Sequence, residues 1–211
     1  MPVPERAREV PDASRAKPRW YHFCVKRAGY VLVGGRSSRM GRDKALLPCR
    51  GELLVQAVAG VVAEAAVSAV LVGDPERYGG LGYPVIPDEA PGEGPLGGIV
   101  TALRHSRADL NLVAACDMPA LSVGFLATLL AAAEANGAAA TLPASPSGRL
   151  EPLCAVYRRD ALPHIEAAFG RGIRKVTAAL EGLPLEVYRI AEVEPFQNVN
   201  TPEEWAGYAR K

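Results

Sequence analysis

The chain has 211 residues, of which 49% are hydrophobic and 22% are charged, a composition typical of a folded globular domain. Its formal net charge of +1 argues against nonspecific binding to nucleic acid or to an anionic membrane surface. No apolar run approaches the roughly 20 residues that cross a bilayer, and the charged, proline-containing N-terminal residues lack the apolar stretch of a signal peptide. We therefore expect a cytoplasmic protein that recognises any anion through a local cluster of basic side chains.

The four cysteines and three histidines are spread along the chain without the spacing of a zinc site. We expect reduced thiols and no zinc. Residues 1–27 are rich in charge and proline, and we expect them to form a disordered extension before a single domain over residues 28–211. A misassigned start codon would produce the same N-terminal composition.

Short apolar runs then alternate with helical patterns. In chain order the sequence predicts a strand at 30–33, a helix at 53–66, strands at 67–72 and 84–86, a helix at 95–105, a strand at 111–115, a helix at 122–136, strands at 138–142 and 150–157, helices at 161–169 and 173–180, a strand at 185–190 and a short helix from Thr201. Ser122 suits the N-cap and Gly137 the stop of the 122–136 helix. This alternation predicts a three-layer α/β/α sandwich with a mostly parallel sheet and an antiparallel C-terminal part.

The segment GGRSSRMGRDK at 34–44 follows the first predicted strand, where open α/β sheets bind ligands. Its glycines allow close approach of backbone amides to an anion, and its four cations match phosphate oxygens: Arg36, Arg39, Arg42 and Lys44. It is not a P-loop, because a P-loop lysine is followed by Ser or Thr, whereas Ala45 follows Lys44. The dinucleotide fingerprint G-x-G-x-x-G is also absent, because Gly34 and Gly35 are adjacent. The segment predicts a triphosphate-binding loop; the alternative is a solvated basic loop.

The stretch VLVGGRSSRMGRDKALL resembles the signature of the molybdenum cofactor guanylyltransferases, which have a Rossmann-like fold. GPLGG, CDMP and NVNTPEE follow in the order found in that family. The resemblance implies transfer of GMP from GTP to the terminal phosphate of molybdopterin or Mo-molybdopterin, with Mg²⁺ as cofactor and pyrophosphate as second product. It also implies a nucleotide half at 28–143 and an acceptor half at 144–211, and allows molybdoenzymes and molybdenum-insertion proteins as partners.

The same resemblance implies a site built from residues of both halves: Leu32, Val33, Gly34, Gly35, Arg36, Lys44, Asp88, Leu96, Gly97, Asp117, Asn198 and Asn200. Lys44 and Arg39 are expected to hold the leaving phosphates, and Asp117 to bind Mg²⁺. The nucleophile is a phosphate that is mostly ionised at neutral pH, so no general base is needed, and catalysis is expected to rest on positioning and charge neutralisation.

Simpler interpretations stand beside these roles. Asp117 could cap a turn, Asp88 could be a solvated loop acid, 94–98 could be only a helix start, and Asn198 could cap the last helix. Five arginines of the C-terminal half are candidates to hold the anionic acceptor: Arg149, Arg158, Arg159, Arg171 and Arg174.

The chain departs from the family pattern at two places. Val33 replaces the usual alanine, and Gly73-Asp74 falls where the family often has asparagine. Rival functions are a molybdopterin cytidylyltransferase, another sugar- or polyol-phosphate nucleotidyltransferase, and a noncatalytic nucleotide-binding adaptor. GPLGG and NVNTPEE favour guanine and molybdopterin.

Overall fold

The structure is a computed structural model and describes residues 26–34 and 43–190. The expected N-terminal extension and the helix from Thr201 lie outside these residues, except for the last positions of the extension. Within them, no helix is long and apolar enough to cross a membrane.

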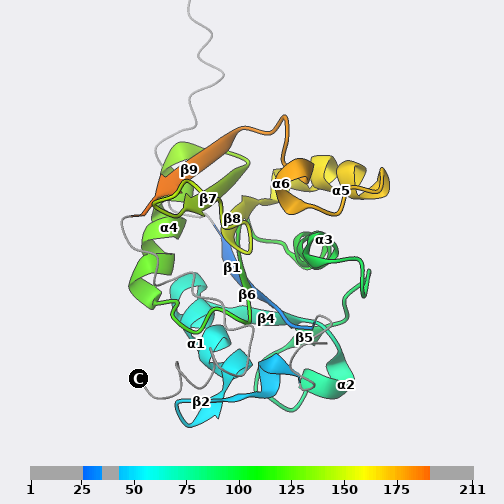
Figure 1. The fold of residues 1–211 in the computed structure, drawn as a ribbon, viewed down its shortest axis with the longest axis vertical. Helices are drawn as coiled ribbons and strands as arrows, with labels where there is room; N and C mark the ends of the chain where they lie inside the picture. Colours follow the sequence, from blue (N-terminus) through cyan, green and yellow to red (C-terminus); the bar gives the residue numbers. More distant parts are fainter. Residues whose placement is uncertain (1–25, 35–42, 191–211) are drawn as a thin grey trace, which may run out of the picture.

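The described elements alternate between strand and helix in the predicted manner (Figure 1). In chain order they are β1 (Arg27–Leu32), the 3-10 turn η3 (Lys44–Leu46), β2 (Pro48–Cys49), β3 (Glu52–Leu53), α1 (Leu54–Ala66), β4 (Ala69–Val72), α2 (Pro75–Tyr78), β5 (Val85–Ile86), α3 (Pro95–His105), β6 (Leu110–Ala115), α4 (Val123–Asn136), β7 (Ala140–Ala144), β8 (Cys154–Arg158), η4 (Arg159–Ala161), α5 (Leu162–Gly170), α6 (Val176–Ala179) and β9 (Leu185–Arg189).

Seven of these strands form one sheet in the order β5-β4-β1-β6-β8-β7-β9. β4, β5 and β6 run parallel to β1, and β8 alone in this described sheet is antiparallel to its neighbours β6 and β7. β9 pairs parallel with β7. The predicted mostly parallel sheet is confirmed, and its antiparallel part is the single strand β8.

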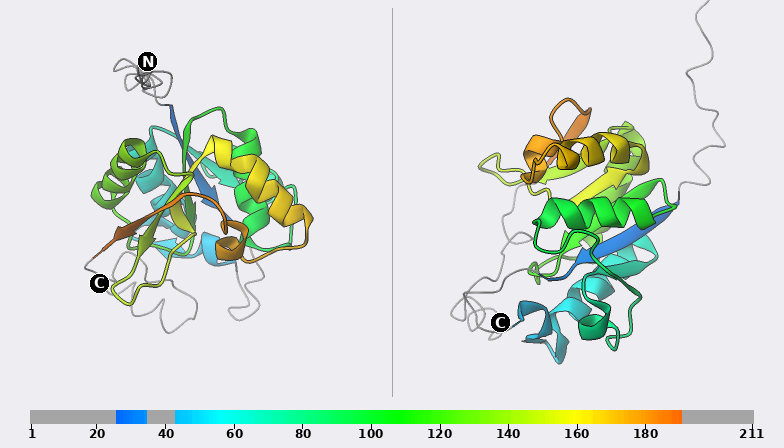
Figure 2. Two further views of the ribbon diagram at one scale, coloured as in Figure 1. Left: turned by 90° about the horizontal axis from the view of Figure 1, so that it is seen from above. Right: turned by 90° about the vertical axis from the view of Figure 1, so that its right-hand side faces the viewer.

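Helices cover both faces of the sheet, which gives the predicted three layers (Figure 2). α1 and α4 pack on one face in a core cluster that includes Leu54, Val58 and Leu126. α3, α5 and α6 pack on the other face around Leu96, Ile99 and Ile165. The chain therefore passes from one face to the other beside β1, and in open α/β sheets a crossing of this kind places a ligand crevice at the carboxyl ends of the strands.

Local signals explain most element boundaries. The Ser122 hydroxyl accepts a hydrogen bond from the Phe125 amide at 3.3 Å, and Gly137 ends α4 with a φ of 71°, both as predicted. The strand predicted at 67–72 begins only at Ala69, because Val67 takes a left-handed φ of 70° where α1 ends. The helix predicted at 173–180 is confined to Val176–Ala179. The β2–β3 hairpin and α2 were not predicted.

Candidate nucleotide site

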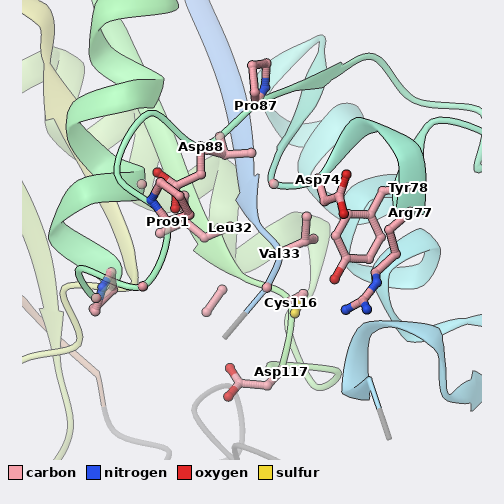
Figure 3. A pocket seen from close by; sticks show the side chains of 18 of the residues that line it. Leu32, Val33, Asp74, Arg77, Tyr78, Pro87, Asp88, Pro91, Cys116 and Asp117 are labelled. Atoms are coloured by element: carbon pink, nitrogen blue, oxygen red, sulfur yellow. The ribbon is translucent and has the colours of Figure 1, made fainter. Parts of the chain in front are cut away.

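A cavity of about 770 Å³ opens at the carboxyl edge of β1, β4, β5 and β6. In Figure 3, Asp88 and Pro91 lie on one side of it, Arg77 and Tyr78 on the other, and Asp117 at one end. Residues at the ends of the strands or just beyond them make up much of its wall: Leu32, Val33, Gly34, Gly73, Asp74, Pro87, Asp88, Cys116 and Asp117. The cavity therefore lies where the loop after the first strand was predicted to act.

Two glycines shape the cavity around the end of β1. Gly34 has a φ of 104°, a conformation that L side chains rarely adopt, and it leads the chain out of β1. At Gly73 a Cβ atom would lie 2.5 Å from Val33 Cγ2 and 2.7 Å from the Val33 carbonyl oxygen. The bulkier Val33 is therefore accommodated by a neighbouring residue that has no side chain.

Asp117, at one end of the cavity wall, lies beside Lys44. Lys44 is the first residue of η3, Asp117 follows β6, and the lysine Nζ lies 3.6 Å from Oδ2 of the aspartate. Both side chains are largely shielded, with 17% and 23% of their surface exposed. Burial raises the pKa of Asp117, whereas the positive charge of Lys44 opposes this rise. The pair brings a cation and a carboxylate to one point, as a site for phosphates and a metal ion requires.

A magnesium ion fits this position as a partner of Asp117 and substrate. Within the described part of the chain, no group of three or more His, Cys, Asp or Glu side chains could hold a metal ion by itself. Mg²⁺ does not need such a cage, because it commonly binds through one or two carboxylates together with water and substrate phosphates. Asp117 supplies a hard oxygen ligand in the cavity wall.

Asp88 also lines the cavity and is held in a fixed orientation. Its Oδ1 accepts a hydrogen bond from the Ala90 amide at 3.0 Å and lies 3.4 Å from the Thr101 hydroxyl. Thr101 is buried in α3 and donates to the Gly97 carbonyl oxygen at 3.0 Å. The loop after β5 is thereby joined to α3, which places the Asp88 carboxylate in the wall; its contact with GTP stays a prediction.

The other predicted site residues divide into two groups. Leu96 is fully buried in the core and, like Gly97 beside it, is not part of the cavity wall, although Gly94, Pro95 and Gly98 are. Any contact of Leu96 or Gly97 with a ligand would pass through the backbone, and that role stays a prediction. The remaining positions lie outside the described residues: Gly35, Arg36, Arg39, Asn198 and Asn200.

The candidate acceptor arginines lie at different places. The Arg158 backbone pairs with Leu110 at the start of β6, so Arg158 and its neighbour Arg159 lie at the sheet edge opposite the cavity. Arg174 pairs with Glu93 at 2.5 Å and lies over the Phe169 ring. Arg149, by contrast, follows β7 at the cavity edge of the sheet and pairs with Glu151 at 3.1 Å.

The sequence assigned no role to several residues of the cavity wall, among them Asp74, Arg77 and Tyr78. Their local signal was available, because Asp74-Pro75-Glu76 has the cap, proline and acid of a helix start. The Asp74 side chain accepts from the Glu76 amide at 2.9 Å and begins α2. No local pattern shows, however, that this short helix turns its side chains toward Asp43.

Cys116 borders Asp117 in the wall, but its thiol is not a candidate nucleophile. Burial raises the pKa of Cys116 to about 12, so the reactive thiolate is scarce at neutral pH. The thiols of Cys49 and Cys154 are also free and buried.

A mostly parallel Rossmann-like sheet with a cavity at its carboxyl edge is the fold of known nucleotidyltransferases. The model of the MobA-like NTP transferase domain matches residues 29–183, and the chain belongs to this family. Relatives include a protein named molybdenum cofactor guanylyltransferase from Rhodobacter capsulatus, 37% identical over 186 residues, which cover 85% of this chain and 93% of the relative. A protein named probable molybdenum cofactor guanylyltransferase from Flavobacterium johnsoniae is 32% identical over 177 residues, covering 83% and 92% of the two chains.

Solved structures agree with this membership. The crystal structure of molybdopterin-guanine dinucleotide biosynthesis protein A from Archaeoglobus fulgidus has a TM-score of 0.73 and 30% identity, covering 87% of this chain and 97% of that one. A CMP:2-keto-3-deoxy-manno-octonic acid synthetase, solved with CTP, has a TM-score of 0.71 at 16% identity, covering 88% and 98%. The second likeness is one of fold alone.

Proposed function

We propose that this protein transfers GMP from GTP to the terminal phosphate of molybdopterin or Mo-molybdopterin. The reaction forms a bond between that phosphate and the α-phosphorus of GTP, and it breaks the bond from the α-phosphorus to pyrophosphate. The observation that carries the proposal is the Lys44–Asp117 pair at the cavity, in a chain 32% and 37% identical to the two guanylyltransferase relatives.

The residues around the cavity have complementary parts in this reaction. Lys44 is placed to neutralise phosphate oxygens of the leaving pyrophosphate, and Asp117 to hold Mg²⁺ against the same phosphates. Bound Mg²⁺ would neutralise charge on the phosphates as the bond breaks. The acceptor phosphate is largely ionised at neutral pH, so no protein group has to remove a proton. Positioning and electrostatics then supply the catalysis.

The direction of approach of the acceptor follows from the sheet order. The nucleotide cavity extends from β6 toward β5, so molybdopterin is expected to reach Asp117 from the side of β8 and β7. Leu153 borders the cavity on that side, and Arg149 lies at the same edge. Of the arginines considered, Arg149 is therefore the strongest candidate to meet the anionic acceptor.

We propose that this reaction takes place in the cytoplasm, in keeping with the free thiols of the described cysteines.

A competition assay tests the proposal. The full chain is mixed with molybdopterin, Mg²⁺ and one of GTP, CTP, UTP or ATP, and pyrophosphate release is followed. We expect fastest release with GTP, and no release when molybdopterin or Mg²⁺ is omitted. Faster release with CTP would overturn the choice of base, whereas tight GTP binding without any release in the presence of molybdopterin would indicate a noncatalytic adaptor.

A further inference from the structure

Asp43 connects two elements that border the candidate nucleotide site. Its Oδ2 accepts a hydrogen bond from the Tyr78 hydroxyl at 2.7 Å and another from Arg77 Nη1 at 3.1 Å. Its Oδ1 accepts from the Ala45 amide at 3.1 Å and so caps η3. One carboxylate thereby joins α2 to the turn in which Lys44 is the first residue.

The hydrogen bond from Tyr78 is the stronger of the two links to α2. Tyr78 is only 1% exposed, and burial together with its hydrogen bond to Asp43 raises the pKa of its hydroxyl, so it stays a donor. A short hydrogen bond from a buried donor to a carboxylate is charge-assisted and strong. The Arg77 side chain is 56% exposed, and ion pairs in contact with water contribute little.

Tyr78 itself has little freedom to move. Its ring fits below the end of β1, where a Cβ atom on Gly73 would lie 3.2 Å from Tyr78 Cε2. In Figure 3 the Tyr78 ring lies beside Val33, at the edge of the cavity. The hydroxyl that binds Asp43 is therefore fixed by the same packing that shapes the cavity wall.

The turn that Asp43 caps is anchored on its other side by the core. Ala45 is 1% exposed, and the Leu47 amide donates to the Lys44 carbonyl oxygen at 3.0 Å. Ala45 is buried on one side and Asp43 is tied to α2 on the other, so the backbone at Lys44 is restrained from both sides. Its side chain then reaches to within 3.6 Å of Asp117.

We propose that Asp43 is a positioning residue that, through its hydrogen bond from Tyr78, aims Lys44 at the triphosphate. The inference rests on the proposed nucleotide site but not on which acceptor is used. Asp43 touches no reacting atom in this role and acts only through Lys44. A purely structural alternative is that Asp43 does no more than satisfy the buried hydroxyl of Tyr78.

A double-mutant cycle separates these two roles. Binding of GTP with Mg²⁺ is measured by calorimetry for the wild-type chain, Asp43→Asn, Lys44→Ala and the double variant. Asp43→Asn should weaken GTP binding about tenfold in the wild-type background, since hydrogen bonds to charged groups are worth that much. In the Lys44→Ala background the same change should alter binding by no more than about twofold, because the side chain it positions is gone.

A second variant and two matched controls keep the test decisive if Asp43→Asn folds poorly. Tyr78→Phe removes only the hydroxyl, and it should raise the KM for GTP several-fold, on the order of the loss expected for one hydrogen bond, with kcat little changed. Asp160→Asn, on an exposed residue at η4, and Tyr83→Phe, outside the cavity wall, should leave the KM unchanged. A merely structural Asp43 would instead lower the active fraction and hence the apparent kcat at unchanged KM.

Equal losses on Asp43→Asn with and without Lys44 would overturn the inference, as would a normal KM for Tyr78→Phe. Failure of the proposed function gives a different result. In that case the wild-type chain would release no pyrophosphate with molybdopterin, while the binding cycle could still be completed. If GTP is not the preferred nucleotide, the cycle is run with whichever of the four nucleotides the wild-type chain binds most tightly.

Discussion

Lys44 and Asp117 meet at the carboxyl edge of the sheet, with 3.6 Å between the lysine Nζ and the aspartate Oδ2. Parallel pairing of β1 with β6 places Asp117 beside the end of β1, because the Cys116 amide donates to the Leu32 carbonyl oxygen at 3.2 Å just where both strands end. Lys44, the first residue of η3, meets it there. The cation that we propose to bind phosphate and the carboxylate that we propose to bind a metal ion thus lie side by side. Removal of the carboxylate and removal of the cation are expected to have different effects.

Replacement of Asp117 by alanine is expected to abolish turnover and leave the fold intact. Pyrophosphate release should fall by about 100-fold or more, since a catalytic metal ion contributes several kcal/mol of transition-state stabilisation. Thermal unfolding should show no loss of stability, because burial already disfavours the charged carboxylate. The exposed Asp160→Asn change serves as control, and substantial Mg²⁺-dependent release by Asp117→Ala would contradict the metal role.

Replacement of Lys44 by alanine is expected to weaken GTP binding more than it slows the bound complex. A charge-assisted contact to phosphate is worth roughly 1.5–3 kcal/mol, which corresponds to a rise of about 10- to 100-fold in the dissociation constant. Calorimetric titration with GTP and Mg²⁺ measures it, and Lys175→Ala, at the start of α6, is a matched control. Unchanged GTP affinity in Lys44→Ala would remove the phosphate role.

Substitution of Gly73 by alanine should destabilise the protein and disturb the cavity together. The added Cβ atom would lie 2.5 Å from Val33 Cγ2 and 2.7 Å from the Val33 carbonyl oxygen, so backbone must shift. Overpacking of this kind costs about 1–3 kcal/mol, which urea unfolding would detect. Gly80→Ala, where no heavy atom lies within 4 Å of the added Cβ, should change stability by about 0.5 kcal/mol or less. Equal stabilities of the two variants would show that Gly73 is not required for packing.

The effect of Glu151 on the free energy of unfolding is expected to depend on pH. Glu151 is 7% exposed, and burial raises the pKa of its carboxyl although Arg149 opposes the rise. The ionised group therefore costs stability above its folded pKa, and this cost disappears as the pH falls through that value to below the unfolded value of about 4.3. We expect Glu151→Gln to have a higher free energy of unfolding than the wild type at pH 7.

The difference between Glu151→Gln and the wild type should shrink as the pH is lowered toward about 4, where both side chains are neutral. Denaturant unfolding at several pH values measures it. Glu186→Gln, which removes an exposed carboxylate of β9, controls for the change in net charge. A stability difference that is the same at both pH values would show that ionisation of Glu151 is not its cause.

Most strands and helix ends follow from residue patterns that are local in the sequence. All seven strands of the large sheet were predicted, the buried ones from continuous apolar runs and the exposed edge strand β9 from the alternating pattern of Leu185–Arg189. Ser122 and Gly137 marked the ends of α4 because capping depends only on neighbouring backbone groups. The hairpin of β2 and β3 was missed, since Pro48–Cys49 and Glu52–Leu53 contain a proline and an acid and form no apolar run like Val85–Ile86 of β5.

By itself the sequence determined the class of fold and the position of a basic, glycine-containing segment ending at Lys44 after the first strand, since these depend on composition and short spacing. Only the tertiary structure decided that Asp117 lies beside Lys44, that Tyr78 binds Asp43, and that Leu96 is buried in the core. It also decided that Arg158 lies at the far edge, because β8 runs antiparallel to β6. The physical reason is that these relations come from the pairing and packing of segments distant in the chain, which no local pattern of residues encodes.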